Sequence, residues 1–234
     1  MAKDNTLRPF SPKVVLRFFL MLLFPAALFV SAGRLNWVMA WVYVVTMLTF
    51  SLGSRLLAAR KNPDLLVERA RSLDAPDVKS WDRVLVPWVA MYGPLAVWVV
   101  CGLDERFGWS LVVPAAWQWV ALGVAVLGMA FSTWAMLENK FFSAAVRIQK
   151  DRHQTVVSTG PYRFVRHPGY AGGLVTYLAT PFVLDAMWGL IPVVLVITGM
   201  FIRTWLEDRT LQEELEGYKD YTQRVRHRLV PGIW

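Results

Sequence analysis

The sequence predicts an all-α polytopic membrane protein with five to six transmembrane helices, a C-terminal helical hairpin and a cytoplasmic amphipathic tail helix. Hydrophobic residues make up 56% of the 234 residues, there are 12 Trp, and the mean hydropathy is +0.39. This composition is far more apolar than that of a soluble domain. Several apolar runs approach the roughly 20 residues that cross a bilayer as a helix. No segment shows the alternation that indicates strands.

The basic residues predict the orientation of these helices. Of the 25 Lys and Arg, 23 lie in four segments: 3–17, 55–83, 140–166 and 203–228. Only Arg34 and Arg106 lie elsewhere. Cytoplasmic loops of membrane proteins carry such an excess of Lys and Arg. We therefore expect an integral, multi-pass membrane protein with these segments and both termini on the cytoplasmic side. The formal charge of +8 then requires no nucleic-acid partner.

The first part of the chain predicts two spans and a polar loop. Residues 14–32 form the first apolar run, and a tight loop at 33–36 leads into a second run at 37–57. The first run resembles a signal peptide, but the spans that follow favour a retained helix. In the loop at 58–83, Asn62-Pro63-Asp64 is typical of a helix start. Its alternating charges indicate either a solvated face or a surface that touches substrate.

The third span is expected at residues 84–102, with a kink at Pro87 and Pro94 because these residues lack the N–H group of a regular helix. Residues 103–110 follow as an outer loop that contains Asp104. The single cysteine of the chain lies at the outer end of this span, where an internal disulfide is impossible. The chain also lacks the clustered Cys and His of a metal site, and we expect no metal.

A fourth span at residues 113–137 contains Gly123 and Gly128, which permit close packing of helices. It completes an N-terminal four-helix membrane region over residues 1–137. Residues 138–234 are then the catalytic region, within one structural domain overall.

The catalytic region begins with a polar, basic stretch at 138–168 and continues as a hairpin. Two apolar runs, 171–184 and 187–206, are separated by Asp185. The first run has only 14 residues, or about 21 Å as a helix, which is short of a bilayer core of about 30 Å. It is either a short tilted crossing or half of a re-entrant hairpin. In both cases the chain returns to the cytoplasmic side.

The tail at residues 208–228 predicts an amphipathic helix on the membrane surface. Its apolar residues recur at helical spacing, with charged residues between them: Leu211, Leu215, Tyr218, Tyr221 and Val225.

Two polar segments flank this hairpin, and they carry the residues that suggest chemistry. In the segment 160–170, GPYRFVRHPGY, Gly160 opens a turn and Pro168 suits the first position of a helix. Arg166 and His167 then precede a helix N-terminus, where backbone N–H groups favour an anion. The segment 203–208, RTWLED, ends the second apolar run. Ionisable residues at the end of a membrane helix suggest function, with interfacial anchoring as the alternative.

These two segments, followed by the ending RLVPGIW, resemble the isoprenylcysteine carboxyl methyltransferase family. That family belongs to a wider group of integral-membrane methyltransferases that includes the phospholipid N-methyltransferases. The resemblance covers residues from about Asn139 to Trp234, whereas the preceding residues agree only in being membrane helices. It implies S-adenosyl-L-methionine as the cofactor and an amphiphilic, prenylated or lipid substrate that is presented from the bilayer. The absence of strands and of a G-x-G-x-x-G segment excludes the soluble Rossmann-type methyltransferases.

The resemblance also implies the site residues. Arg166, Arg203 and Glu207 are the candidates for catalysis, with the two arginines handling the substrate carboxylate or the charged end of the cofactor. Cofactor binding is implied for a larger group, in which the two acids close the pocket: Gln154, Gly160, Tyr162, His167, Pro168, Tyr170, Gly172, Glu207 and Asp208. Family members commonly carry a histidine where this chain has Gln154, which removes a proton-handling group there.

Methyl transfer from a sulfonium requires mainly that the nucleophile be held in line and that water be excluded. A carboxylate nucleophile is already anionic, so it needs an orienting cation and no general base. We therefore expect carboxyl O-methylation of an isoprenylated cysteine or a similar amphiphile. One alternative is N-methylation of a phospholipid or other amine, which requires a base. Another is NADPH-dependent reduction of a sterol or polyprenyl double bond, because sterol reductases carry a motif close to R-H-P-x-Y.

Overall fold

In the computed structural model, residues 12–72 and 75–234 are described, with side chains from Leu22 onward, and all regular elements in these ranges are helical. Most of the polar lead expected at the N-terminus lies outside the described residues. The longer helices are α1 (Pro12–Ala32), α2 (Val38–Lys61), α3 (Pro63–Arg71), α4 (Asp82–Pro87), α5 (Gly93–Phe107), α6 (Ala115–Glu138), α7 (Pro168–Val183), α8 (Leu190–Glu214) and α9 (Tyr218–Arg224). The all-α prediction is therefore confirmed.

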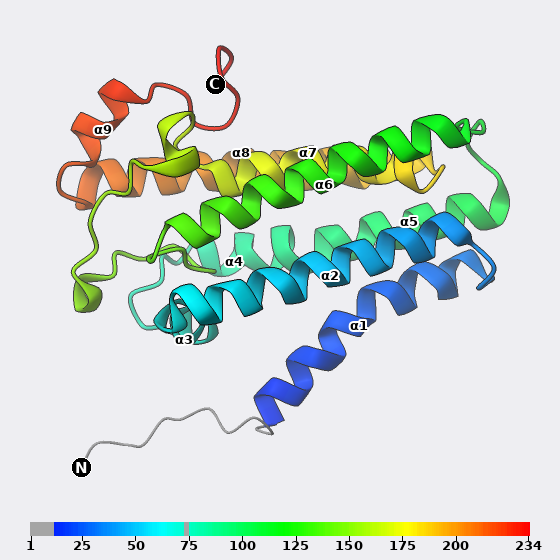
Figure 1. Cartoon of the computed structure of the whole chain (residues 1–234), viewed down its shortest axis with the longest axis horizontal. Coiled ribbons are helices and arrows are strands. Elements are labelled where there is room, and N and C mark those ends of the chain that lie inside the picture. Colours follow the sequence, from blue (N-terminus) through cyan, green and yellow to red (C-terminus); the bar gives the residue numbers. More distant parts are fainter. Residues whose placement is uncertain (1–11, 73–74) are drawn as a thin grey trace.

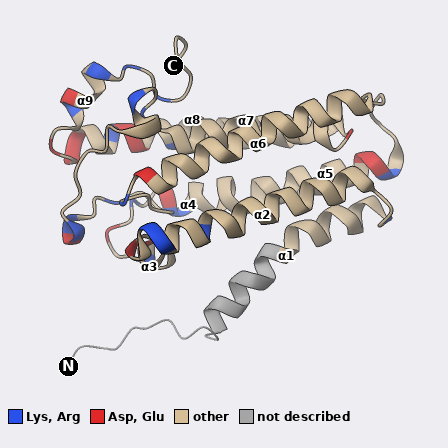
Figure 2. Cartoon of the chain, in the orientation of Figure 1, with Lys and Arg blue, Asp and Glu red and all other residues tan. Residues whose placement is uncertain are grey.

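Among the residues that the structure describes, four helical stretches are long and apolar enough to cross a membrane: Val38–Lys61, Asp82–Phe107, Ala115–Glu138 and Met187–Glu214. Helices α2, α5, α6, α7 and α8 run along the long axis of the molecule, and the loop between α6 and α7 gathers with α9 and the C-terminus at one end (Figure 1). Figure 2 shows that Lys, Arg, Asp and Glu concentrate at this end, while the middle parts of the long helices carry almost none. We call it the polar end.

The third span contains the expected irregularity. The π-helical turn Trp88–Tyr92 joins α4 to α5, between Pro87, the last residue of α4, and Pro94 in the first turn of α5. Both prolines lack the N–H that a regular helix would use, so the hydrogen-bond ladder shifts its spacing there. This irregular segment packs against α8.

The loop expected at 103–110 starts later than predicted, because α5 continues to Phe107. The carboxylate of Asp104 is buried and accepts hydrogen bonds from the N–H groups of Ser110 (2.9 Å) and Trp188 (3.0 Å). It therefore joins the end of α5 to the turn that precedes α8. Asp185 in the same turn has φ +53° and accepts from the N–H of Val113. These two acids fix the far end of the α7–α8 hairpin.

Helices α6 and α7 pack closely through glycine. A methyl group on Gly128 would lie 2.7 Å from the carbonyl oxygen of Gly172, and one on Gly172 would lie 2.3 Å from that of Gly128. Gly128 thus has the packing role that the sequence predicted. Gly123 does not, since the residue is exposed and a methyl group there would have nothing within 4 Å of it.

The predicted tail helix was wrong in its bounds and surroundings. Helix α8 runs to Glu214, and Gly217, with φ +77°, separates it from α9. The five periodic apolar residues of the tail do lie together on one side of this segment, in a single cluster. That face packs against Ile148 and Val156 of the loop between α6 and α7, so a protein segment covers it.

Candidate functional site

The chain enters α7 through a turn at the polar end. Residues Gly160–Arg163 form a 3₁₀ turn, and Gly160 has φ +56°, which glycine adopts with little strain. His167 is the residue before α7 and Pro168 is its first residue, as predicted. The return of α8 to this point is also confirmed, because Arg166 and His167 both contact Asp208.

Asp208 lies at the centre of a network of buried hydrogen bonds and ion pairs. Its side chain is fully buried, and its two oxygens accept from Arg166 Nε (2.7 Å) and Nη2 (2.9 Å) and from Arg228 Nε (2.8 Å). The Tyr218 hydroxyl donates to it at 3.1 Å, and His167 Nε2 lies at 3.3 Å. We call these five residues the Asp208 network. Because protein groups occupy the carboxylate, it orders the residues around the site and has little capacity left for a ligand.

Arg166 also holds the C-terminal segment. Its Nη1 donates to the carbonyl oxygens of Val225 and Arg226, each at 2.8 Å. The backbone N–H groups of Arg166 and His167 donate to the carbonyls of His227 (3.0 Å) and Arg228 (2.9 Å). The ending R-L-V-P-G-I-W is thereby fixed beside the N-terminus of α7. All three sequence segments that carry the family resemblance meet at this point, because Asp208 accepts from both Arg166 and Arg228.

Arg203 is held in a second buried ion pair. Its Nε and Nη2 donate to the two oxygens of Asp82, at 2.7 and 3.2 Å, and Nη2 also donates to the Ala144 carbonyl at 2.9 Å. Asp82, at 0% exposure, additionally accepts from the Val146 N–H. The Arg203 guanidinium lies 5.2 Å from the centre of the Tyr170 ring. Both predicted catalytic arginines are therefore committed to internal carboxylates.

Glu207 has a different environment from its neighbour Asp208. The Tyr170 hydroxyl donates to Glu207 Oε2 at 2.6 Å, and the Tyr170 ring stacks on His167 with the centres 5.9 Å apart. Glu207 is only partly buried, and no Lys or Arg of the described chain lies within ion-pairing distance of it. The pair Tyr170–Glu207 thus presents an oriented carboxylate that forms no ion pair in the described chain, close to the N-terminus of α7.

The other predicted residues lie around this pair with varied partners. Tyr162 is buried beside the end of α6; its hydroxyl accepts from Asn139 Nδ2 at 3.2 Å, and burial raises the pKa of this phenol. Gln154 accepts from the Gln149 N–H at 2.7 Å, within its own loop. The neighbours of Gly172 belong to α6, which gives it a packing role; a cofactor contact there stays a prediction.

Sequence reasoning missed the carboxylates that position the site. Asp82 pairs with an arginine 121 residues away, and no local pattern signals that contact. Arg147 is likewise buried, and its guanidinium binds Glu68 through two hydrogen bonds of 2.8 Å and also reaches Asp77 and Asp151. The hydrogen bonds to Glu68 and Asp151 raise the pKa of Arg147, and the one from Arg147 lowers the pKa of Asp151. This cluster ties α3 to the loop before α7.

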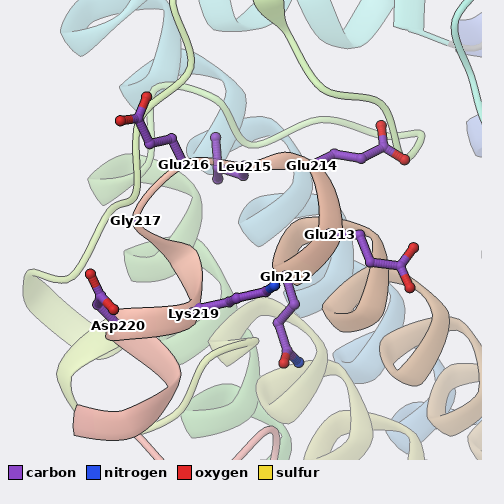
Figure 3. A pocket seen from close by; sticks show the side chains of 8 residues that line it. All are labelled: Gln212, Glu213, Glu214, Leu215, Glu216, Gly217, Lys219 and Asp220. Carbon is purple, nitrogen blue, oxygen red and sulfur yellow. The ribbon is translucent and has the colours of Figure 1, made fainter.

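A surface pocket lies at the turn between α8 and α9, next to the Asp208 network (Figure 3). Most of its lining side chains are exposed, and three of the lining residues are glutamates. The pocket is lined by Gln212, Glu213, Glu214, Leu215, Glu216, Gly217, Lys219 and Asp220. None of the predicted site residues lines it. Gln212 connects the two regions, since its side chain amide donates to Asp208 at 2.9 Å.

Known proteins are similar to this chain in sequence. A family model described as phospholipid methyltransferase matches residues 116–216. Protein-S-isoprenylcysteine O-methyltransferases of Rattus norvegicus and Mus musculus are each 25% identical over 218 residues, covering 88% of this chain and 70% of theirs. A probable protein-S-isoprenylcysteine O-methyltransferase of Oryza sativa subsp. indica is 25% identical over 119 residues, covering 50% of this chain and 62% of its own.

The rodent matches extend well upstream of Asn139, so the similarity reaches further into the membrane helices than the motifs indicated. Together, the family model and the relatives support a membrane methyltransferase. They confirm the resemblance that the motifs suggested: this chain is similar to the isoprenylcysteine carboxyl methyltransferases and to the wider group that includes the phospholipid methyltransferases.

Proposed function

We propose that this chain is an S-adenosylmethionine-dependent integral-membrane methyltransferase that methylates the carboxylate of an isoprenylated cysteine or a similar amphiphile. The observation that carries the proposal is the Tyr170–Glu207 pair, an oriented carboxylate without a cationic partner in the described chain, beside the N-terminus of α7. A half-buried carboxylate of this kind fits the ammonium group of an amino-acid cofactor. The names of the relatives support the choice of acceptor.

The residues would divide the work between holding ligands and holding the protein. Glu207, oriented by Tyr170, would bind the cofactor's ammonium group. The cofactor supplies a methyl group on a positively charged sulfur, which is already activated for transfer. In the transfer, an acceptor carboxylate oxygen forms a bond to the methyl carbon as the carbon–sulfur bond breaks, and a neutral thioether leaves. Charge is balanced without any proton transfer, so the site needs no general base.

The buried pairs would serve this reaction by preorganisation. The Asp208 network and the Arg203–Asp82 pair hold α7, α8 and the preceding loop in one arrangement. Interactions fixed before the ligand arrives need no reorganisation during the reaction. The phenols of Tyr162 and Tyr218 do not compete as bases, because burial raises the pKa of each above its ordinary value.

Methyl transfer to defined acceptors tests this function. Purified protein in nanodiscs receives radiolabelled S-adenosylmethionine with N-acetyl-S-farnesylcysteine, its geranyl and S-methyl analogues, or phosphatidylethanolamine. We expect label on the farnesylated acid, released as methanol by alkali because the product is an ester. The shorter analogues should react with a lower kcat/KM, since each buried methylene contributes about 0.8 kcal/mol to binding.

The match to the phospholipid methyltransferase model favours one other candidate, N-methylation of an amine lipid. Alkali-stable label in phosphatidylethanolamine, with none in the prenylated acid, would replace our proposal with that activity. Equal labelling of the farnesyl and S-methyl acids would rule out recognition of the lipid chain.

A further inference from the structure

Arg69 is a cation at the polar end that the function proposed above does not use. It lies on α3, the short helix between α2 and the irregular third span. Leu65 of the same helix is buried against Ala58 of α2 and Met136 near the end of α6. Arg69 is thus carried by an element that is packed firmly against two of the long helices.

Its guanidinium has an unsatisfied group. The Nη1 atom of Arg69 is buried and has no hydrogen-bond partner, and it is the one such side-chain atom in the described part of the chain. A buried donor without an acceptor costs about 1–3 kcal/mol, and more when it is charged. Native proteins leave few such groups, and each one calls for an explanation such as a missing ligand.

Two buried carboxylates, on α3 and α4, are already taken by other groups. Glu68, next to Arg69 in the chain, binds Arg147, and Asp82 binds Arg203. Each bond is 3.2 Å or shorter, so either of these two carboxylates could serve Arg69 only by leaving an existing pair.

The surroundings of Arg69 lead to the N-terminus of α7. Its guanidinium carbon lies 5.2 Å from the centre of the Phe142 ring, and a methyl group on Gly169, in the first turn of α7, would lie 2.8 Å from Cε2 and Cζ of the same ring. Burial, together with the positive charges of Arg55 and Arg203, lowers the pKa of Arg69 to about 10, while Tyr170 acts in the opposite direction. The surroundings of Arg69 therefore carry too little negative charge to balance its positive charge.

We propose that Arg69 is an anion-binding residue whose Nη1 group receives the carboxylate of a ligand beside Tyr170 at the N-terminus of α7. Arginine suits this role because its planar fork matches a carboxylate and it stays charged when buried. The inference deepens the proposed function and rests on it for the identity of the ligand. Two ligands of that reaction carry a carboxylate, the prenylated acceptor and S-adenosylmethionine, and they are separated by experiment.

The test compares each carboxylate with a neutral or shortened analogue. Dissociation constants are measured with the full-length protein in nanodiscs for N-acetyl-S-farnesylcysteine against its carboxamide, and for S-adenosylmethionine against decarboxylated S-adenosylmethionine. We expect the wild type to prefer the carboxylate of one pair by about tenfold, the scale of a charge-assisted hydrogen bond. Arg69→Met should abolish that preference, Arg69→Lys should keep part of it, and the affected pair identifies the ligand.

Arg71→Met is the matched control, because Arg71 is an exposed residue at the end of the same helix. It should leave both preferences unchanged. Arg69→Met should also keep or raise the Tm of the ligand-free protein, since it removes an unsatisfied buried cation. A marked fall in Tm, with both preferences retained in Arg69→Lys and in the folded fraction of Arg69→Met, would overturn the proposal in favour of a structural role.

The outcome is independent of whether methyl transfer occurs. A wild type that transfers methyl, but whose Arg69→Met variant keeps both carboxylate preferences, removes the Arg69 inference and leaves the proposed function. A wild type that shows Arg69-dependent carboxylate preference without any methyl transfer removes the proposed function and leaves the anion site. A wild type with no preference in either pair overturns the anion site directly.

Discussion

Glu207 and Asp208 are adjacent acids on α8 with opposite surroundings. Consecutive residues of a helix point in directions about 100° apart, so one carboxylate is directed into the buried Asp208 network while the other meets Tyr170. Asp208 is satisfied by two guanidinium groups, whereas Glu207 accepts one hydrogen bond from a neutral hydroxyl. The first arrangement stabilises the protein, and the second leaves negative charge available to a ligand.

Single substitutions should therefore separate the two roles. Asp208→Asn leaves two guanidinium groups without their carboxylate, and breaking a buried pair in this way costs about 3–5 kcal/mol. We expect a clear fall in Tm. Glu207→Gln should keep the Tm and weaken S-adenosylmethionine binding by at least about tenfold, or 1.4 kcal/mol. Thermal unfolding and cofactor titration of the same two preparations measure both effects.

The reverse pattern, with Glu207→Gln unstable and Asp208→Asn stable but deficient in binding, would exchange the two assignments. The sequence predicted that both acids close the cofactor pocket and did not indicate which of them is held by internal ion pairs. Which carboxylate meets Arg166 depends on how α8 is rotated against the segment before α7, and local sequence does not set that rotation.

At the scale of elements, the α6–α7 contact depends on two glycines that face each other. A Cβ on Gly172 would approach the Gly128 carbonyl oxygen to 2.3 Å and Ser132 Oγ to 2.4 Å. The first of these atoms belongs to the backbone, so the helices would have to separate. A Cβ on Gly199 would likewise meet Trp88 Cδ1 at 2.8 Å.

Gly172→Ala should therefore destabilise the protein and displace the N-terminal turn of α7 with its site residues. We expect a lower Tm and a large loss of methyl transfer. Gly123→Ala is the matched control on α6, because nothing lies within 4 Å of its Cβ position. In an exposed helix position it should be neutral or stabilising by up to about 1 kcal/mol. Equal Tm values for the two variants would show that the close contact is unimportant.

Apolar periodicity predicted the elements better than it predicted their neighbours. The helix start at Pro168, the irregularity between Pro87 and Pro94 and the apolar face of the tail all follow from local rules. The same face was assigned to a membrane surface, but Ile148 of the preceding loop covers it. A periodic pattern predicts that a face is buried. Which segment covers that face depends on contacts between distant parts of the chain, as the pairing of Asp82 with Arg203 also does.

At the scale of the whole molecule, charge is distributed unevenly along the long axis. The long helices carry few charges in their middle parts, and most charged residues gather at the polar end, together with the candidate site (Figure 2). The opposite end has a small set that includes Arg34, which pairs with Glu105, and the buried Asp104. A water-soluble cofactor would reach the site from the compartment that the polar end faces.

The distribution of basic residues predicts that this compartment is the cytoplasm, because 23 of the 25 Lys and Arg then lie on the cytoplasmic side. Single cysteines test this orientation in intact cells. Leu111, 91% exposed between α5 and α6, should as cysteine react with a membrane-impermeant maleimide added outside. Lys150, exposed in the loop before α7, should as cysteine react only after the membrane is opened. The native Cys101 is fully buried and gives a low background.

Labelling of Lys150→Cys from outside, with Leu111→Cys protected, would show that the orientation is the reverse of the predicted one. The candidate site would then face away from the cytoplasmic cofactor pool.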